Sequence, residues 1–271
     1  MIKIIDVDQL FDKYISDYVY GNIGKVKPEE IENNIPKLYL EFGDVKLKEL
    51  DGKSPNEYYK AFTCAELLEC LKKHLEKEVS VSDFLCEALT DQKNEKELVG
   101  ALDGENDEEF ILYLMNILGE LNSKLIKKRY LEFITWDYSL PIKELATEQL
   151  KMISEDVKED VLLAFSDADQ TVKDYLTEIL AECKGDERVF DILVAEFAKH
   201  QDNVPLYAGY LAKYGDERAL PFLLASIERE KISYADFEEL RFAIEALGGK
   251  YDKERDFSAD KTYKKIKNAG K

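Results

Sequence analysis

Apolar residues recur at helical spacing along almost the whole chain, and no segment shows the strict alternation of a half-buried strand. From about residue 94, apolar-periodic segments of ten to sixteen residues alternate with breaks of two to five residues. The helices predicted there are 94–103, 106–120, 123–135, 140–153, 156–166, 169–183, 186–199, 203–214, 216–230 and 234–248. Their succession as five pairs of roughly thirty residues predicts an all-α chain built from helical repeats.

The tetrapeptide Gly-Asp-Glu-Arg occurs twice, starting at Gly185 and at Gly215, thirty residues apart. Each glycine follows a predicted helix, where a left-handed residue is favoured. The next aspartate can cap the following helix, and Asp156 lies at the same interval upstream. No His, Ser or Cys recurs with the tetrapeptide. We interpret it as the boundary of a structural repeat and not as a duplicated active site.

The segments "DERALPFLLASI" and "LRFAIEALGG" resemble a HEAT-like repeat of the type first recognised in phycobilisome-lyase relatives. The matching residues are Asp216, Arg218, Pro221, Arg241, Ala243, Ala246, Leu247 and Gly248. The resemblance is good for 216–248, fair for 154–215, by pattern alone for 94–153, and absent for 1–79. It implies a right-handed α-solenoid of about five HEAT-like helix pairs, each packing on its neighbours. The structural residues predicted at the repeat junctions are Asp186, Arg188, Asp216, Arg218 and Arg241.

Residues 1–79 are helical in pattern but do not repeat. Ser54 and Glu57 have the spacing of a capping box at the start of one helix. We therefore predict an N-terminal helical module over 1–90 that caps the first repeat, a HEAT-like solenoid over 91–249, and a basic tail or terminal helix over 250–271.

The net charge of −19 is unevenly distributed. Residues 91–249 contain 18 Lys and Arg against 35 Asp and Glu, a net charge of −17, whereas residues 250–271 contain 8 against 4, a net charge of +4. An acidic body disfavours nucleic acid and anionic membranes as partners, and it favours a protein partner, in particular a basic one. The start of the chain lacks the pattern of a signal peptide, and no apolar stretch is long enough to span a membrane. Four scattered cysteines without a CxxC pair are typical of a reduced, cytoplasmic protein.

Motifs for specific chemistry are incomplete. The segment "LDGKSP" lacks the first glycine of a phosphate-binding loop, since Leu47 occupies that position. The segment "DGENDEE" lacks the glycine and the final glutamate of a calcium loop, so Asn106 or Asp107 is expected to cap the next helix. Cys70 and His74 share a helix face, but a zinc site needs three or four ligands. We therefore predict no catalytic residue, no metal and no cofactor, and we favour a protein that is not an enzyme.

Three aromatic residues are the predicted partner-binding candidates. Aligned repeats equate Tyr207 with Thr177 and Ala243, and Tyr214 with lysines, which indicates positions outside the deep core. Tyr207 and Tyr214 are seven residues apart and share a helix face. Trp136, at a break between helices, is either a wedge between repeats or another exposed anchor.

The predicted function is that of a non-catalytic scaffold or adaptor with an acidic solenoid surface for protein binding. The alternative is a DNA-binding enzyme that resembles the alkylpurine DNA glycosylases, whose HEAT-like fold carries a cationic groove; the net charge disfavours it. A tetrapyrrole-attaching lyase is suggested by the repeat type alone. The sequence pattern does not indicate the oligomeric state of the protein.

Overall fold

In the computed structural model, residues 2–22 and 27–269 are described, and every regular element among them is helical. They form sixteen α-helices and two short 3₁₀ helices, which confirms the all-α prediction. The chain divides into two compact units, residues 1–129 and residues 130–271. Among the described residues, no helix combines the length and the apolar content needed to cross a membrane.

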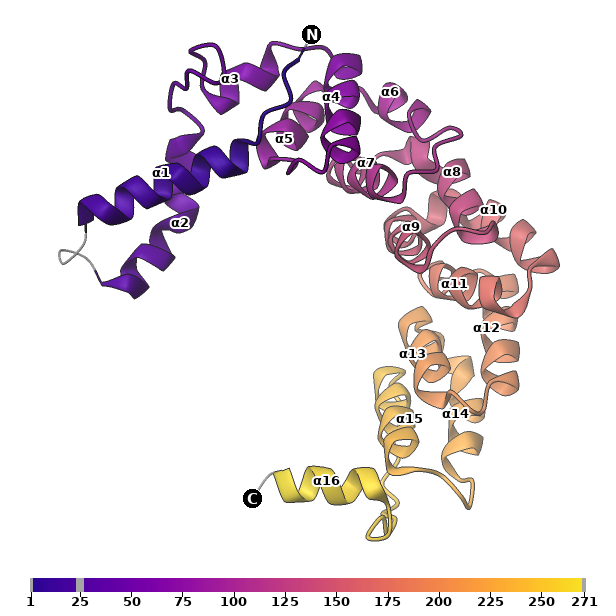
Figure 1. Ribbon diagram of the computed structural model, residues 1–271. Helices are drawn as coiled ribbons and strands as arrows, with labels where there is room; N and C mark the ends of the chain where they lie inside the picture. Colours follow the sequence, from indigo (N-terminus) through magenta and orange to yellow (C-terminus); the bar gives the residue numbers. More distant parts are fainter. Residues whose placement is uncertain (1, 23–26, 270–271) are drawn as a thin grey trace. The chain divides into compact units, whose positions relative to one another are not determined.

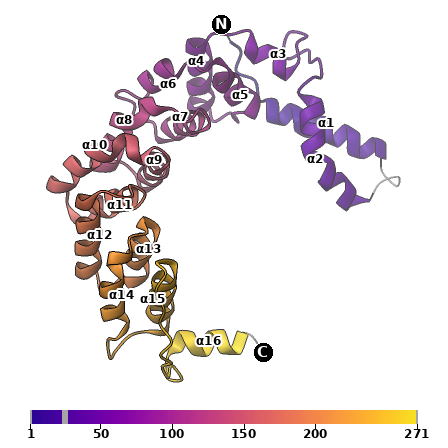
Figure 2. The same cartoon turned by 180° about the vertical axis from the view of Figure 1, so that it is seen from behind.

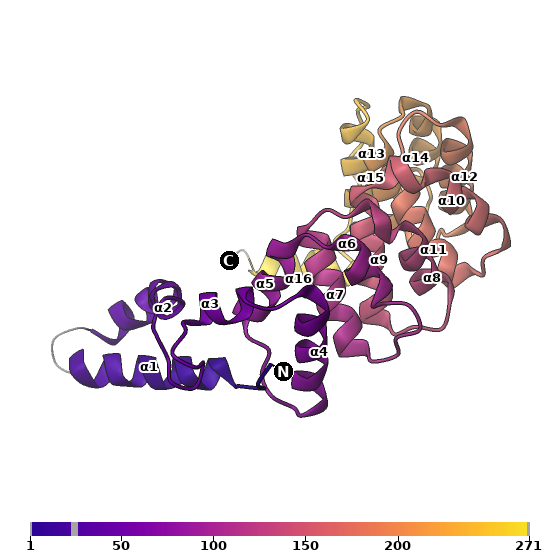
Figure 3. The same cartoon turned by 90° about the horizontal axis from the view of Figure 1, so that it is seen from above.

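The first unit contains seven α-helices and one 3₁₀ helix within its described residues. Their bounds are α1 Val7–Asn22, α2 Pro28–Phe42, α3 Pro55–Lys60, α4 Cys64–Glu76, α5 Asp83–Gln92, α6 Glu95–Gly100, α7 Glu108–Glu120 and η1 Lys124–Ile126. Helices α1 and α2 lie side by side (Figure 3). Helix α5 packs against α3, α4 and α7. The Ser54–Glu57 capping box begins α3 as predicted, and Asp107 caps α7 through a hydrogen bond from the N–H of Phe110.

The boundary between the units lies at residue 129, inside the segment that the sequence pattern assigns to the repeats. The reason lies in α7. Its apolar face, which includes the buried Ile111 and Leu114, packs against α4 and α5. The helices on both sides of residue 90 therefore share one core.

The second unit begins within α8 and contains paired helices. The bounds are α8 Lys127–Thr135, α9 Leu140–Met152, α10 Ser154–Asp167, α11 Gln170–Leu180, α12 Glu187–Lys199, α13 Val204–Tyr214, η2 Glu217–Ala219, α14 Leu220–Ile227, α15 Tyr234–Ala246 and α16 Lys261–Ala269. From residue 94 onward, most observed helices begin and end within about three residues of the predicted ones. A terminal helix, α16, is present in the predicted basic tail.

Helices of the second unit lie in two rows. Each pair α10–α11, α12–α13 and α14–α15 packs together, and α11 also packs on α9, as α15 does on α13. Figures 1 and 2 show α10, α12 and α14, which we call the first row, on one side of this unit, and α9, α11, α13 and α15, which we call the second row, following one another on the other side. The second row buries apolar residues, among them Leu176, Leu211 and Leu240, and its helices pack on the first row and, in the pairs α9–α11 and α13–α15, on one another. The second row therefore presents its remaining face to solvent.

Candidate protein-interaction site

Tyr207 and Tyr214 are core residues, so the prediction that they lie outside the deep core is wrong. Their exposed fractions are 3% and 2%. The hydroxyl of Tyr207 donates to Asp174 Oδ1 at 2.8 Å, and its ring stacks on His200 with 4.6 Å between centroids. Burial first, and then the Asp174 carboxylate, raise the pKa of the Tyr207 hydroxyl above its usual value. The hydroxyl of Tyr214 donates to the carbonyl oxygen of Asp186 at 2.9 Å. Neither side chain is available as an exposed anchor.

The comparison of sister repeats failed for a physical reason. Thr177 and Ala243, which were equated with Tyr207, are themselves 0% and 1% exposed, so a small or hydroxyl-bearing residue did not indicate an exposed position. Thr177 is satisfied within its own helix, because its hydroxyl donates to the carbonyl oxygen of Lys173 at 2.7 Å. A buried hydroxyl with such a partner carries little penalty.

The two Gly-Asp-Glu-Arg segments form matching turns. Gly185 and Gly215 adopt φ values of +80° and +82°, the left-handed region that favours glycine. Asp186 begins α12 and accepts a hydrogen bond from the backbone N–H of Arg188, and the same arrangement recurs thirty residues later at the start of η2. In both copies the aspartate thus caps the next helix, and Gly215 also ends α13, whereas α11 ends earlier, at Leu180.

Arg188 and Arg218 each connect two successive helices of the first row. Arg188 bonds Glu159 of α10 through both terminal nitrogens, at 2.9 and 2.6 Å. Arg218 reaches Glu187 of α12 at 2.9 Å and lies over the Phe190 ring at 4.4 Å. Each arginine thus pairs with a carboxylate of the preceding first-row helix.

The same arginines set the ionisation of the capping aspartates. The hydrogen bonds from the Arg188 side chain hold the pKa of Asp186 well below its usual range, and Arg218 lowers the pKa of Asp216 in the same way. Both carboxylates therefore remain charged where they cap the helices.

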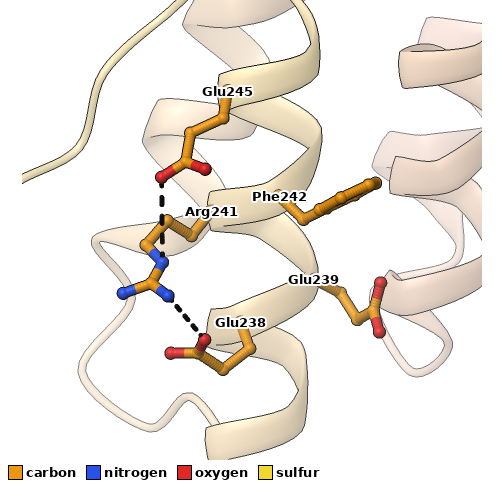
Figure 4. A pocket seen from close by; sticks show the side chains of 5 residues that line it. All are labelled: Glu238, Glu239, Arg241, Phe242 and Glu245. Carbon is orange, nitrogen blue, oxygen red and sulfur yellow. Dashed lines mark hydrogen bonds and ion pairs between the residues drawn. The ribbon is translucent and has the colours of Figure 1, made fainter.

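Arg241 does not lie at a repeat junction, and that prediction is wrong. Its Nη2 lies 2.8 Å from Glu238 Oε2 and its Nε 4.0 Å from Glu245 Oε1, and all three residues belong to α15. Figure 4 shows Arg241 between these two carboxylates, with Phe242 and Glu239 projecting from the other side of the helix. The spacing i, i+3 and i, i+4 explains the geometry, because such residues are neighbours on a helix surface.

A hollow on the solvent side of α15 is lined by five residues. They are Glu238, Glu239, Arg241, Phe242 and Glu245, which we call the α15 face. Phe242 is 68% exposed, although it is a large aromatic residue on a well-packed helix. Helix α15 buries its opposite side, including Leu240 and Ile244. Phe242 is thus a large apolar side chain within an otherwise charged surface.

The charges of the α15 face are unbalanced. Three carboxylates and one guanidinium give a formal charge of −2. Arg241 interacts with Glu238 and Glu245, whereas Glu239 has no ion pair within the part of the chain that the structure describes. Glu239 is three residues before Phe242, which places the two side chains side by side. The arrangement suits a partner that offers an apolar group next to a cation.

Trp136 is 56% exposed and follows the end of α8, where its backbone N–H donates to the carbonyl oxygen of Glu132 at 2.9 Å. It stays a candidate contact residue. Because Tyr207 and Tyr214 are buried, the three aromatic residues proposed from the sequence do not form one exposed surface.

Phe242 was missed as a site residue because the alignment that equates Tyr207 with Thr177 and Ala243 also places Phe242 at the position of the apolar residues Leu206 and Leu176, which is typical of a core position. Leu176 is buried, but Leu206 is 41% exposed and Phe242 is more exposed still. A signal was present: Phe242 has glutamates at i−4, i−3 and i+3, which places it on the charged side of α15.

Cys70 and His74 are both buried. The Nδ1–H of His74 donates to the carbonyl oxygen of Ser80 at 2.8 Å, and burial raises the pKa of the Cys70 thiol to about 12. Across residues 2–22 and 27–269, no three His, Cys, Asp or Glu side chains converge on a position for a metal ion.

Comparison of the chain with protein-family models, with curated proteins and with solved structures finds no match.

Proposed function

We propose that this chain is a non-catalytic protein-interaction scaffold, and that the α15 face binds a basic segment of a protein partner. The observation that carries the proposal is Phe242, exposed to 68% beside the unpaired carboxylate of Glu239. Exposed aromatic side chains with a charged rim are typical of the centre of a protein interface.

We further propose that the paired helices are HEAT-like repeats of an α-solenoid. The support comes from the second unit: the two rows of helices, the capped turns thirty residues apart, and Arg188 and Arg218, which connect successive first-row helices. In such a fold, the second helices of consecutive repeats form a continuous surface for a partner. Helix α15 contributes the α15 face to that surface.

The charge of the chain supports a basic partner. The excess of acidic residues between 91 and 249 attracts a cationic segment over the distance set by salt screening, about 10 Å at 0.1 M ionic strength. Charge then accelerates encounter and sets specificity, while burial of the Phe242 ring supplies affinity.

The test uses a defined probe and a matched control. A fluorescein-labelled amphipathic peptide of Lys and Leu at helical spacing is titrated with the full chain, and fluorescence anisotropy is measured at 20, 150 and 500 mM NaCl. We expect binding that weakens with salt, and a loss of about tenfold in affinity for Phe242→Ala, which corresponds to ~1.4 kcal/mol.

The control is Phe222→Ala. Phe222 is a phenylalanine of α14 that is 43% exposed, so the substitution removes the same ring from the first row of helices. Equal effects of the two substitutions, or affinity that does not depend on salt, would refute the proposed site. A second peptide with Glu in place of Lys is expected not to bind.

A further inference from the structure

Helix α16 is a cationic helix attached to the second unit by its first turn. Asp260 accepts hydrogen bonds from the backbone N–H groups of Thr262 and Tyr263 at 2.8 and 3.0 Å, and its other oxygen accepts from the N–H of Tyr234 at 3.3 Å. The Tyr263 ring packs against the Tyr234 ring with 5.0 Å between centroids. These contacts hold the start of α16 at the start of α15.

Beyond that turn, α16 extends away from α15, as Figures 1 and 2 both show. Ile266, one turn after Tyr263, is 56% exposed. Lys261, Lys264, Lys265 and Lys267 are exposed, and within the described residues none of them makes an ion pair. The helix contains no acidic residue. The Lys267 ammonium lies over the Tyr263 ring, 5.6 Å from its centroid. The outer part of α16 therefore combines one free apolar side chain with several cations that have no carboxylate partner in the described part of the chain.

This pattern is complementary to the α15 face. Ile266 has a lysine on each side in the sequence, and Phe242 has Glu239 on one side and the Glu238–Arg241–Glu245 group on the other. Within one copy the pairing is prevented by the attachment of α16: Phe242 is eight residues after Tyr234, about 12 Å along the helix at 1.5 Å per residue. Reaching it would require breaking the Tyr263–Tyr234 contact and the Asp260 cap.

We infer that α16 of one copy binds the α15 face of a second copy. The inference rests on the proposed function, because it assigns a specific basic segment to the same face. A membrane is a poorer occupant for α16, since Ile266 is the one large apolar side chain left after Tyr263 packs on Tyr234, and stable bilayer binding needs a broader apolar face.

The interface is small. A nine-residue helix cannot bury the ~1,200 Å² that stable protein interfaces need, so the association is weak and transient. Two copies, each with a net charge of −19, also repel one another at long range. The repulsion extends over ~30 Å at 0.01 M salt but only ~8 Å at 0.15 M, while charges in direct contact are screened less. Self-association is therefore strongest at intermediate salt, unlike the binding of a cationic peptide, which weakens steadily with salt.

Sedimentation velocity of the full chain from 10 to 300 µM, at 10, 150 and 1000 mM NaCl, tests the inference. We expect a weight-average sedimentation coefficient that rises with concentration and rises most at 150 mM. Two variants are each expected to weaken the association by about tenfold. One carries Glu239→Lys, and the other carries Lys265→Glu together with Lys267→Glu. Mixing these two variants restores it, because each then supplies the charges that the other has lost. Lys184→Glu with Lys231→Glu, at two exposed lysines outside α16, lowers the net charge by as much as the double substitution in α16 and leaves the association unchanged.

A monomer at every concentration, or a mixture that does not associate, overturns the inference. Binding of the Lys–Leu peptide to Phe242 would still stand in that case, so the failure of this inference is distinguishable from failure of the proposed function. Circular dichroism of each variant confirms that the helices are intact.

Discussion

Replacing Tyr207 by alanine is expected to lower the free energy of unfolding by about 3–5 kcal/mol, because the ring is 3% exposed and its removal leaves a cavity in a packed core. Tyr207→Phe isolates the hydroxyl. A hydrogen bond to a charged acceptor contributes about 1.5–3 kcal/mol. Asp174 keeps a second donor, Gln170 Nε2 at 2.9 Å, so we expect the lower end of that range. Phe242→Ala, at a ring that is 68% exposed, should change stability by about 0.5 kcal/mol or less.

Urea unfolding followed by circular dichroism at 222 nm measures these differences. The chain has one tryptophan, Trp136, which lies in the same unit as Tyr207, so its fluorescence reports the unfolding of that unit. The same substitutions are then compared in the peptide titration, where Phe242→Ala should lose affinity and Tyr207→Phe should not. If Tyr207→Ala unfolded at the same urea concentration as the parent chain, the assignment of Tyr207 to the core would be wrong.

Other predictions follow from single contacts. Asp216→Ala should lower the free energy of unfolding by about 1 kcal/mol at pH 7, because it removes a helix cap. Arg218 lowers the folded-state pKa of Asp216, so the carboxylate stabilises the fold above about pH 4 and this contribution is lost as the pH falls further. Urea unfolding should therefore show a smaller difference in stability between the parent chain and the variant at pH 3 than at pH 7. Gly215→Ala should cost about 1–2 kcal/mol at φ +82°, whereas Gly209→Ala, inside α13 with no atom near its added Cβ, should stabilise by up to ~1 kcal/mol in the same assay. The thiol of Cys183, whose pKa burial raises to about 11, should react with a disulfide reagent at pH 8 only after urea is added.

Much of the local structure could be predicted because its causes are local. The apolar periodicity predicted the helices after residue 94, and the charged turns at Gly185 and Gly215 predicted where the next helices begin. The sequence left Asn106 and Asp107 as alternative caps of the next helix, and Asp107 is the one that caps α7. The division at residue 129 was not predictable in this way, because it depends on which helices share a core, and α7 packs with α4 and α5.

The exposed residues were harder to predict because exposure depends on the direction in which each residue points around the helix axis, which we call the phase of the helix. Counted from the last buried leucine, Gly185 comes five residues after Leu180, whereas Gly215 comes four residues after Leu211. Aligning the repeats on their glycines therefore shifts α11 against α13 by one residue, which is a rotation of about 100°. Aligned on burial instead, Tyr214 corresponds to Cys183, which is 0% exposed.

For the same reason, the pattern of buried and exposed residues within a single helix is a better guide to a binding surface than an alignment of repeats on their turns. Turn residues are determined by backbone conformation, and they align even when one residue is added between the helix and its glycine. Core positions are determined by contact with the neighbouring helices, and such an addition rotates them relative to the turn. Within α15 no alignment is needed: Leu240 and Ile244 define the buried side, and Phe242 lies among glutamates on the other. A phenylalanine ring exposed in this way contributes little to the stability of the fold. Contact with a partner therefore explains its presence better than packing does.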